Sequence, residues 1–124
     1  MLLALLLLIA PIAQTTPAPQ TYRVEIHPRF DPVGYMGELK LWVSSDGYVN
    51  GLYRPDTGGS LENVRGGREG THLWFDIPAL GGLHVEVTVD QKGALSGTAS
   101  SNSSRKVYIF TAKPEEPSDP RSRT

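Results

Sequence analysis

Apolar and polar side chains alternate with a period of two along much of the chain between residues 21 and 112. This period is typical of β-strands that bury one face and expose the other. No window of the sequence keeps a helical period, so we expect an all-β domain. The apolar positions of the four clearest runs are Tyr22, Val24 and Ile26; Leu39, Leu41 and Val43; Leu73, Phe75 and Ile77; and Leu83, Val85, Val87 and Val89.

Three short segments that end in glycine, residues 45–47, 80–82 and 91–93, lie between successive runs. A three-residue hairpin loop takes a glycine at its left-handed last position. Its odd length also keeps apolar residues opposite apolar residues across the two strands. The predicted pairs are Val43 with Val49, Leu41 with Gly51, Val89 with Leu95, Val87 with Gly97, Ile77 with Val85, and Phe75 with Val87.

Other segments are less regular. Residues 107–112 are apolar at both alternating sets of positions, which predicts a more fully covered closing strand. Residues 28–37 read as a long loop. The weakest strand is expected at residues 61–66, and the Arg65-Gly66-Gly67-Arg68 segment is interpreted as a turn.

A strand–turn–strand unit occurs twice, at residues 39–51 and 85–97. Each copy ends in a glycine, Gly51 or Gly97, at an inward-facing position, where a glycine allows the sharp strand bend that a closing barrel needs. With about eight strands, the chain is predicted to form a small up-and-down antiparallel β-barrel, with the architecture seen in lipocalins and streptavidin. The alternative is a two-sheet β-sandwich.

The N-terminal residues 1–13 are almost wholly apolar and are too short to cross a bilayer as a helix. They fit the hydrophobic region of a signal peptide, with an uncleaved anchor as the alternative. Residues 14–20 are rich in Pro and Thr and read as a linker, residues 21–114 as the barrel domain, and residues 115–124 as a disordered tail. We therefore expect a periplasmic or extracellular protein with no transmembrane span after processing.

The charges and the absence of cysteine exclude several classes of partner and site. The formal net charge is −1 and there is no cysteine. A chain without a net positive charge has no field that attracts nucleic acid, so no nucleic-acid partner is expected. Disulfides and thiolate metal sites are ruled out, and the core alone must hold the domain together. No cofactor motif is present, so we expect no cofactor.

Four motifs are spread over residues 37–99: Asp46-Gly47-x-Val49-x-Gly51, Pro55-Asp56-x-Gly58, Leu73-x-Phe75-x-Ile77-Pro78-Ala79-x-Gly81-Gly82, and Gly93-x-Leu95-Ser96-Gly97. With these motifs the chain resembles a small accessory β-barrel domain of uncharacterised bacterial exported proteins, often found in front of α/β-hydrolase domains. The resemblance implies a barrel in the bacterial envelope without recognised catalytic residues.

Two groups of outward-facing side chains are candidates for binding. Trp42 and Trp74 stand where Ser, Thr or Lys is expected, and with Tyr48 they are the candidate contacts for a ligand or partner. The structural alternative is that each tryptophan packs under the N-terminal arm or the long loop.

The second group is a weak metal candidate formed by Asp76, Glu86 and His84. The predicted register places the two carboxylates opposite each other, which costs stability unless a cation or proton lies between them. The alternatives are a register that differs by two residues, or carboxylates that are simply solvated.

From these features the sequence predicts an exported, non-catalytic binding or accessory module, whose partner is an unknown small molecule, glycan or protein. The alternative is a structural or protein-assembly module. A metal-dependent enzyme is the third reading.

Overall fold

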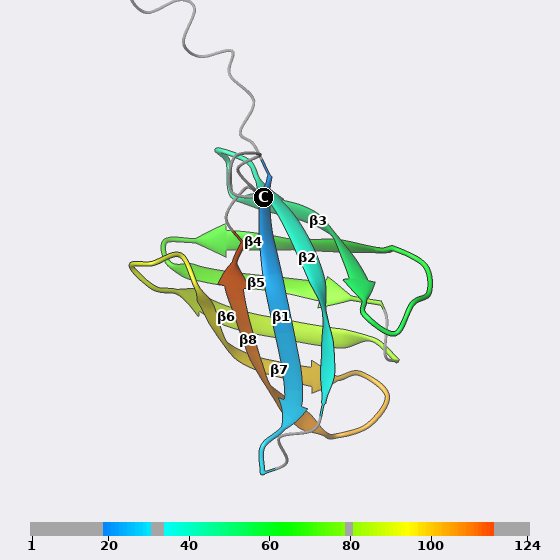
Figure 1. Ribbon diagram of the computed structural model, residues 1–124. Helices are drawn as coiled ribbons and strands as arrows, with labels where there is room; N and C mark the ends of the chain where they lie inside the picture. The colour runs from blue at the N-terminus through cyan, green and yellow to red at the C-terminus, as the bar shows by residue number, and fades with distance from the viewer. Residues whose placement is uncertain (1–18, 31–33, 79–80, 116–124) are drawn as a thin grey trace, which may run out of the picture.

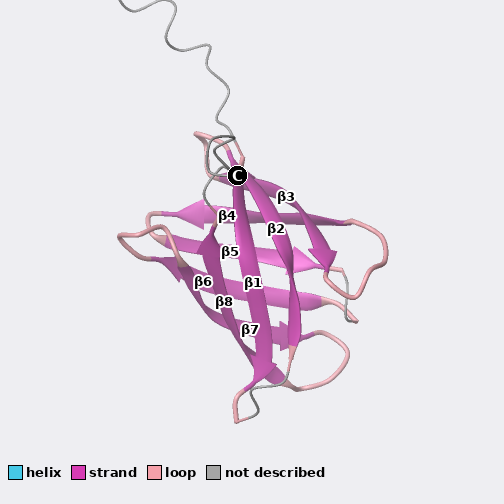
Figure 2. Ribbon diagram, in the orientation of Figure 1, coloured by secondary structure: helices cyan, strands magenta, loops and turns pink. Residues whose placement is uncertain are grey.

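The computed structural model of the chain describes residues 19–30, 34–78 and 81–115. These residues form a closed barrel of eight antiparallel strands, each hydrogen-bonded to the next along the chain, with β8 closing on β1. In Figure 1, β1, β2 and β8 cross in front of β4, β5 and β6, and Figure 2 shows strands and loops only. The strands are β1 (Gln20–Pro28), β2 (Tyr35–Val43), β3 (Tyr48–Pro55), β4 (Glu62–Glu69), β5 (His72–Ile77), β6 (Leu83–Val89), β7 (Leu95–Ser101) and β8 (Val107–Pro114).

This architecture confirms the predicted up-and-down barrel of about eight strands, and the sandwich alternative is wrong. The part of the chain that the structure describes contains no helix that could span a membrane. The predicted signal segment, residues 1–13, lies outside the described residues, as do residues 14–18 of the predicted linker and residues 116–124 of the predicted tail.

The predicted inward positions form the core of the barrel. Phe75 and Phe110 are fully buried at its centre, where their rings meet edge to face with centroids 5.8 Å apart. Tyr53 is also fully buried, and its hydroxyl lies over Gly37, where a Cβ would be only 2.7 Å from it. Among the described residues this hydroxyl has no hydrogen-bond partner. A barrel of this size is therefore filled by its own side chains at mid-height.

Two of the three predicted hairpins have the predicted register. Val43 pairs with Val49, and Val89 pairs with Leu95. The loops end in Gly47 and Gly93, which have φ values of +90° and +84° as a bulged three-residue turn requires. The repeat glycines Gly51 and Gly97 pair with Leu41 and Val87 as predicted.

The third hairpin differs from its prediction by two residues. Ile77 pairs with Leu83, not with Val85, and Phe75 pairs with Val85, not with Val87. The connection therefore spans residues 78–82, and both Gly81 and Gly82 adopt positive φ. A slip of two residues keeps every apolar side chain on the same face, so the alternation of the sequence cannot detect it.

Two segments predicted as irregular are strands instead. The Arg65–Arg68 segment lies inside β4, not in a turn, because its glycines let β4 lie close against β5: a Cβ on Gly66 would be 1.8 Å from the Trp74 carbonyl oxygen. The predicted loop 28–37 is shorter than expected, since β2 begins at Tyr35. Residues 107–112 lie in β8, where residues 108–112 are buried or half-buried on both faces and only the first residue, Val107, is exposed, at 53%.

Candidate functional site

The three aromatic residues predicted as contacts lie on the outer surface of β2, β3 and β5. Tyr48 is 65% exposed, whereas Trp42 and Trp74 are half-buried. Tyr48 and Trp74 both pair with Gly67 of β4, one from each side. Trp42 lies one strand further on, opposite Asn50. The structure therefore places the three residues on one curved face but does not bring the two indoles together.

Trp74 owes its partial burial to Gly67. A Cβ on Gly67 would lie 2.5 Å from the indole atom Cζ2 of Trp74, so the ring covers the glycine directly. His72 stacks against the same indole with ring centroids 5.4 Å apart. Covering a sheet glycine with a cross-strand aromatic ring is a known way to stabilise that position. Trp74 therefore has a structural role, in which it packs on β4. Residues 14–18 of the N-terminal arm and residues 31–33 of the long loop, the alternative covers that the sequence suggested, lie outside the described residues.

The weak metal candidates lie in a chain of contacts across the outer face of β5 and β6. Asp76 lies opposite His84, not opposite Glu86 as predicted. The Nδ1 atom of His84 is 2.8 Å from Asp76 Oδ1, and its Nε2 atom is 3.3 Å from Glu86 Oε2. The other carboxylate oxygen of Glu86 is 3.3 Å from His72 Nε2. An imidazole thus separates the two carboxylates and relieves the repulsion that the predicted register implied.

Within residues 19–30, 34–78 and 81–115, no group of three or more His, Cys, Asp or Glu side chains is arranged to hold a metal ion. The contacts instead change the acidity of the imidazole. The hydrogen bond to Asp76 raises the pKa of His84 above its ordinary value of 6.5, partial burial opposes this, and the negative charges of Asp76 and Glu86 add to the increase.

A group whose pKa is higher in the folded state stabilises the fold while it is protonated. His84 should therefore contribute its full stabilisation below about pH 6.5, and this contribution should disappear as the pH rises through its folded-state pKa. Urea unfolding at a series of pH values should show this loss in the wild type and not in His84→Gln. The imidazole resonances of His84, followed by NMR, should titrate above pH 6.5, and their midpoint should shift toward lower pH in Asp76→Asn. A wild-type midpoint below 6.5 would contradict this assignment.

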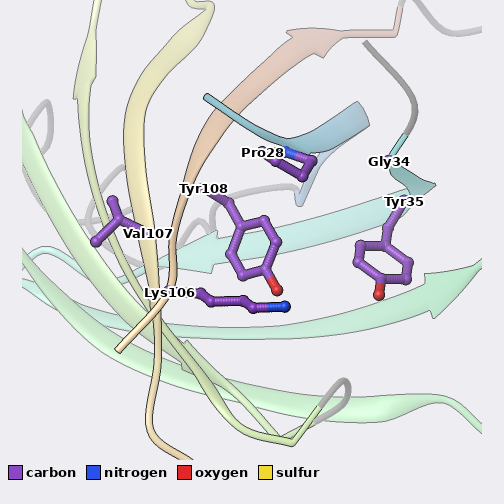
Figure 3. Close-up of a pocket in the computed structure, with 6 residues that line it drawn as sticks. All are labelled: Pro28, Gly34, Tyr35, Lys106, Val107 and Tyr108. Carbon is purple, nitrogen blue, oxygen red and sulfur yellow. The ribbon is translucent and has the colours of Figure 1, made fainter. Parts of the chain in front are cut away.

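A cavity lies at the end of the barrel opposite the start of β1 and the end of β8, at the bottom of Figure 1. We call it the Tyr35 end: here β1 finishes and β2 and β8 begin. The cavity has a volume of about 440 Å³ and is partly open to solvent. It is lined by Pro28, Gly34, Tyr35, Lys106, Val107 and Tyr108 (Figure 3).

The two tyrosines are held at the cavity by the strands that carry them. Tyr35 pairs with the core residue Ile26, and Tyr108 precedes Phe110 on the inward face of β8. Their rings meet edge to face, with centroids 6.4 Å apart and an angle of 71° between the planes. A second cavity of about 230 Å³ adjoins the first at these two rings and is also lined by Ile26 and Leu83, which are buried. The site thus has an apolar floor and two phenol rings at its mouth.

The sequence pattern did not point to this cavity. The pattern places Tyr35 in a long loop and Tyr108 in a more fully covered closing strand. Only the closure of β8 on β1 brings the two tyrosines to one end of the barrel. One available signal was Tyr108 itself, since a tyrosine at the first inward position of a strand often keeps its hydroxyl at the water boundary.

Comparisons with protein-family models, curated proteins and solved structures found no match to this chain. Its function must therefore be inferred from its own side chains.

Proposed function

We propose that the chain is an exported, non-catalytic binding module that holds a small molecule in the cavity at the Tyr35 end. The observation that carries the proposal is the cavity of about 440 Å³, because ligand pockets occupy about 300–1,000 Å³ and lie in the mouths of β-barrels. The middle of the barrel is packed with side chains such as Phe75 and Phe110, so the ligand is held at the Tyr35 end. The export part of the proposal rests on the apolar residues 1–13.

The lining supports binding more than catalysis. Two tyrosine rings give broad apolar surface with hydroxyls at the edge, a combination that is frequent in binding sites. The three-membered chain of Asp76, His84 and Glu86 contacts lies on the outer wall of β5 and β6 and does not line the cavity. A substrate in the cavity would therefore not meet these titratable groups.

A titration of the ¹⁵N-labelled full chain with phenol, a small neutral aromatic probe, tests the proposal. We expect saturable shift changes at the amides of Gly34, Tyr35 and residues 106–108. Tyr35→Ala and Tyr108→Ala should weaken binding about tenfold by removing one wall, equivalent to about 1.4 kcal/mol. Tyr48→Ala, at the opposite end, is the matched control and should leave binding unchanged.

Two results would contradict this proposal. Shift changes centred on Tyr48 and Trp74 would move the site to the outer aromatic face. Absence of any saturable change would remove the binding function itself. The melting temperature of each variant should be measured alongside, so that lost binding is not confused with lost folding.

A second candidate function, protein assembly, is favoured by a different observation. Phe30 is 93% exposed and Val107 is 53% exposed, and both lie at the Tyr35 end. Exposed apolar side chains gathered at one place are typical of interaction surfaces. Sedimentation of the full chain over a range of concentrations distinguishes the two functions, because assembly requires an oligomer and ligand binding by a monomer does not.

A further inference from the structure

The cavity at the Tyr35 end carries a positive charge at its rim. Lys106 lines the cavity, and in Figure 3 its side chain runs beneath the Tyr108 ring with its ammonium group directed toward the space beside Tyr35. Its backbone is held by a hydrogen bond from the Ser101 amide to the Lys106 carbonyl oxygen, 3.0 Å. This hydrogen bond therefore fixes the backbone position, at the edge of the barrel, from which the Lys106 side chain extends.

No carboxylate among residues 19–30, 34–78 and 81–115 forms an ion pair with Lys106. The ion pairs between described residues join Arg23 to Asp56 and Arg54 to Glu38, and the remaining contacts involve histidines. None of them includes Lys106, so no described carboxylate lies within ion-pairing distance of its ammonium group. A cation beside an apolar cavity is free to pair with an anion supplied by a ligand.

The polarity of the site changes with depth. The inner end is formed by Ile26 and Leu83, whose exposed fractions are 0% and 1%. The outer end carries the ammonium group of Lys106 and the hydroxyls of Tyr35 and Tyr108, which Figure 3 shows on the same side as the ammonium. A ligand that matches this order has an apolar body that enters first and one anionic group that stays at the mouth.

We propose that the ligand is a small hydrophobic monocarboxylate, whose apolar body lies against Ile26 and Leu83 and whose carboxylate pairs with Lys106. This inference rests on the proposed function, since it names the ligand class of the same cavity. One cation favours a single negative charge, because a second charge would be left without a partner in a half-enclosed site. A cavity in the lower half of the usual size range favours a body no larger than one or two rings or a short alkyl chain.

Benzoate and its neutral isostere benzamide form the probe pair, measured by NMR titration of the full chain at low salt. We expect the wild type to bind benzoate about tenfold more tightly than benzamide. Lys106→Met should abolish this preference and leave the affinity for benzamide unchanged, and Lys106→Arg should keep it. Arg105→Met removes the same charge from the adjacent exposed residue, so it is the matched control and should retain the preference.

The outcomes separate this inference from the function on which it rests. Equal binding of benzoate and benzamide to the wild type overturns the carboxylate inference and leaves small-molecule binding standing. A preference for benzoate that survives in Lys106→Met assigns the charge to another residue and overturns the role of Lys106. If neither probe binds, both the inference and the proposed function fail.

Discussion

Replacing Phe110 by alanine should lower the free energy of unfolding by about 4 kcal/mol, within the range for a buried phenylalanine. Phe110 is fully buried and pairs with Gly97, so its ring fills space that β7 cannot fill with a side chain of its own. The edge-to-face contact with Phe75 is lost as well. Because the barrel is closed, the surrounding strands can move only a little into the space that the removed phenylalanine ring leaves.

Urea unfolding followed by circular dichroism measures this loss. In a domain of this size the change corresponds to a fall in melting temperature of about 15–30 °C. Ile109→Ala is the matched control, since Ile109 is the next residue on β8 and points outward, half-buried; its loss should be about 1 kcal/mol. If Phe110→Ala costs no more than Ile109→Ala, the barrel interior is not packed as described.

The faces of the strands could be predicted from the sequence because side-chain direction in a strand depends only on parity. Tyr22, Val24 and Ile26 lie inside for this reason, and the prediction needed no knowledge of neighbouring strands. Register requires more information. The turns ending at Gly47 and Gly93 supplied it, because each has one glycine at one left-handed position.

The connection between β5 and β6 contains two consecutive glycines, Gly81 and Gly82, and both are left-handed. With two such positions, a three-residue and a five-residue loop satisfy the sequence equally well. Because of this ambiguity, the predicted register paired Asp76 with Glu86, whereas in the structure Asp76 pairs with His84. The interpretation of Asp76, Glu86 and His84 as a weak metal candidate depended on that predicted register. The length of the β5–β6 connection thus determines whether the Asp76 and Glu86 carboxylates lie opposite each other or are separated by the His84 imidazole.

The glycines of β4 show a different limit. Gly66 and Gly67 look like turn residues because glycine is usually found where the backbone must take positive φ. Here the two glycines allow β5 to lie close to β4. Gly66 lies against the backbone of β5, and Gly67 lies under the indole of Trp74. The covering ring lies on another strand, so the local sequence does not contain the information. The cavity at the Tyr35 end was missed for the same reason, since its walls come from two segments that lie far apart in the sequence, residues 28–35 and 106–108.

Replacing Gly97 by alanine should destabilise the fold by about 3 kcal/mol, at the upper end of the cost of overpacking. A Cβ on Gly97 would lie 2.0 Å from the Glu86 carbonyl oxygen and 2.8 Å from the Val87 Cα. Both are backbone atoms of β6, so they can move only if the β6–β7 ladder opens. The close approach of β7 to β6 at this position therefore depends on the missing side chain, as does any sharp bend of the kind that the sequence repeat predicted.

The sign of the change in the free energy of unfolding shows whether a side chain at residue 97 collides with β6 or is tolerated there. Where the backbone tolerates a side chain, Gly→Ala stabilises a protein by about 0.4–1 kcal/mol through the unfolded state. Gly51→Ala, at the equivalent repeat position, should cost less than Gly97→Ala, because one of its two close contacts is the flexible Leu41 side chain. Ser96→Ala, on the outer face of β7, is the control and should change stability by less than about 0.5 kcal/mol. A neutral or stabilising Gly97→Ala would show that β7 can pass β6 with a side chain in place, and the barrel would then close without the bend.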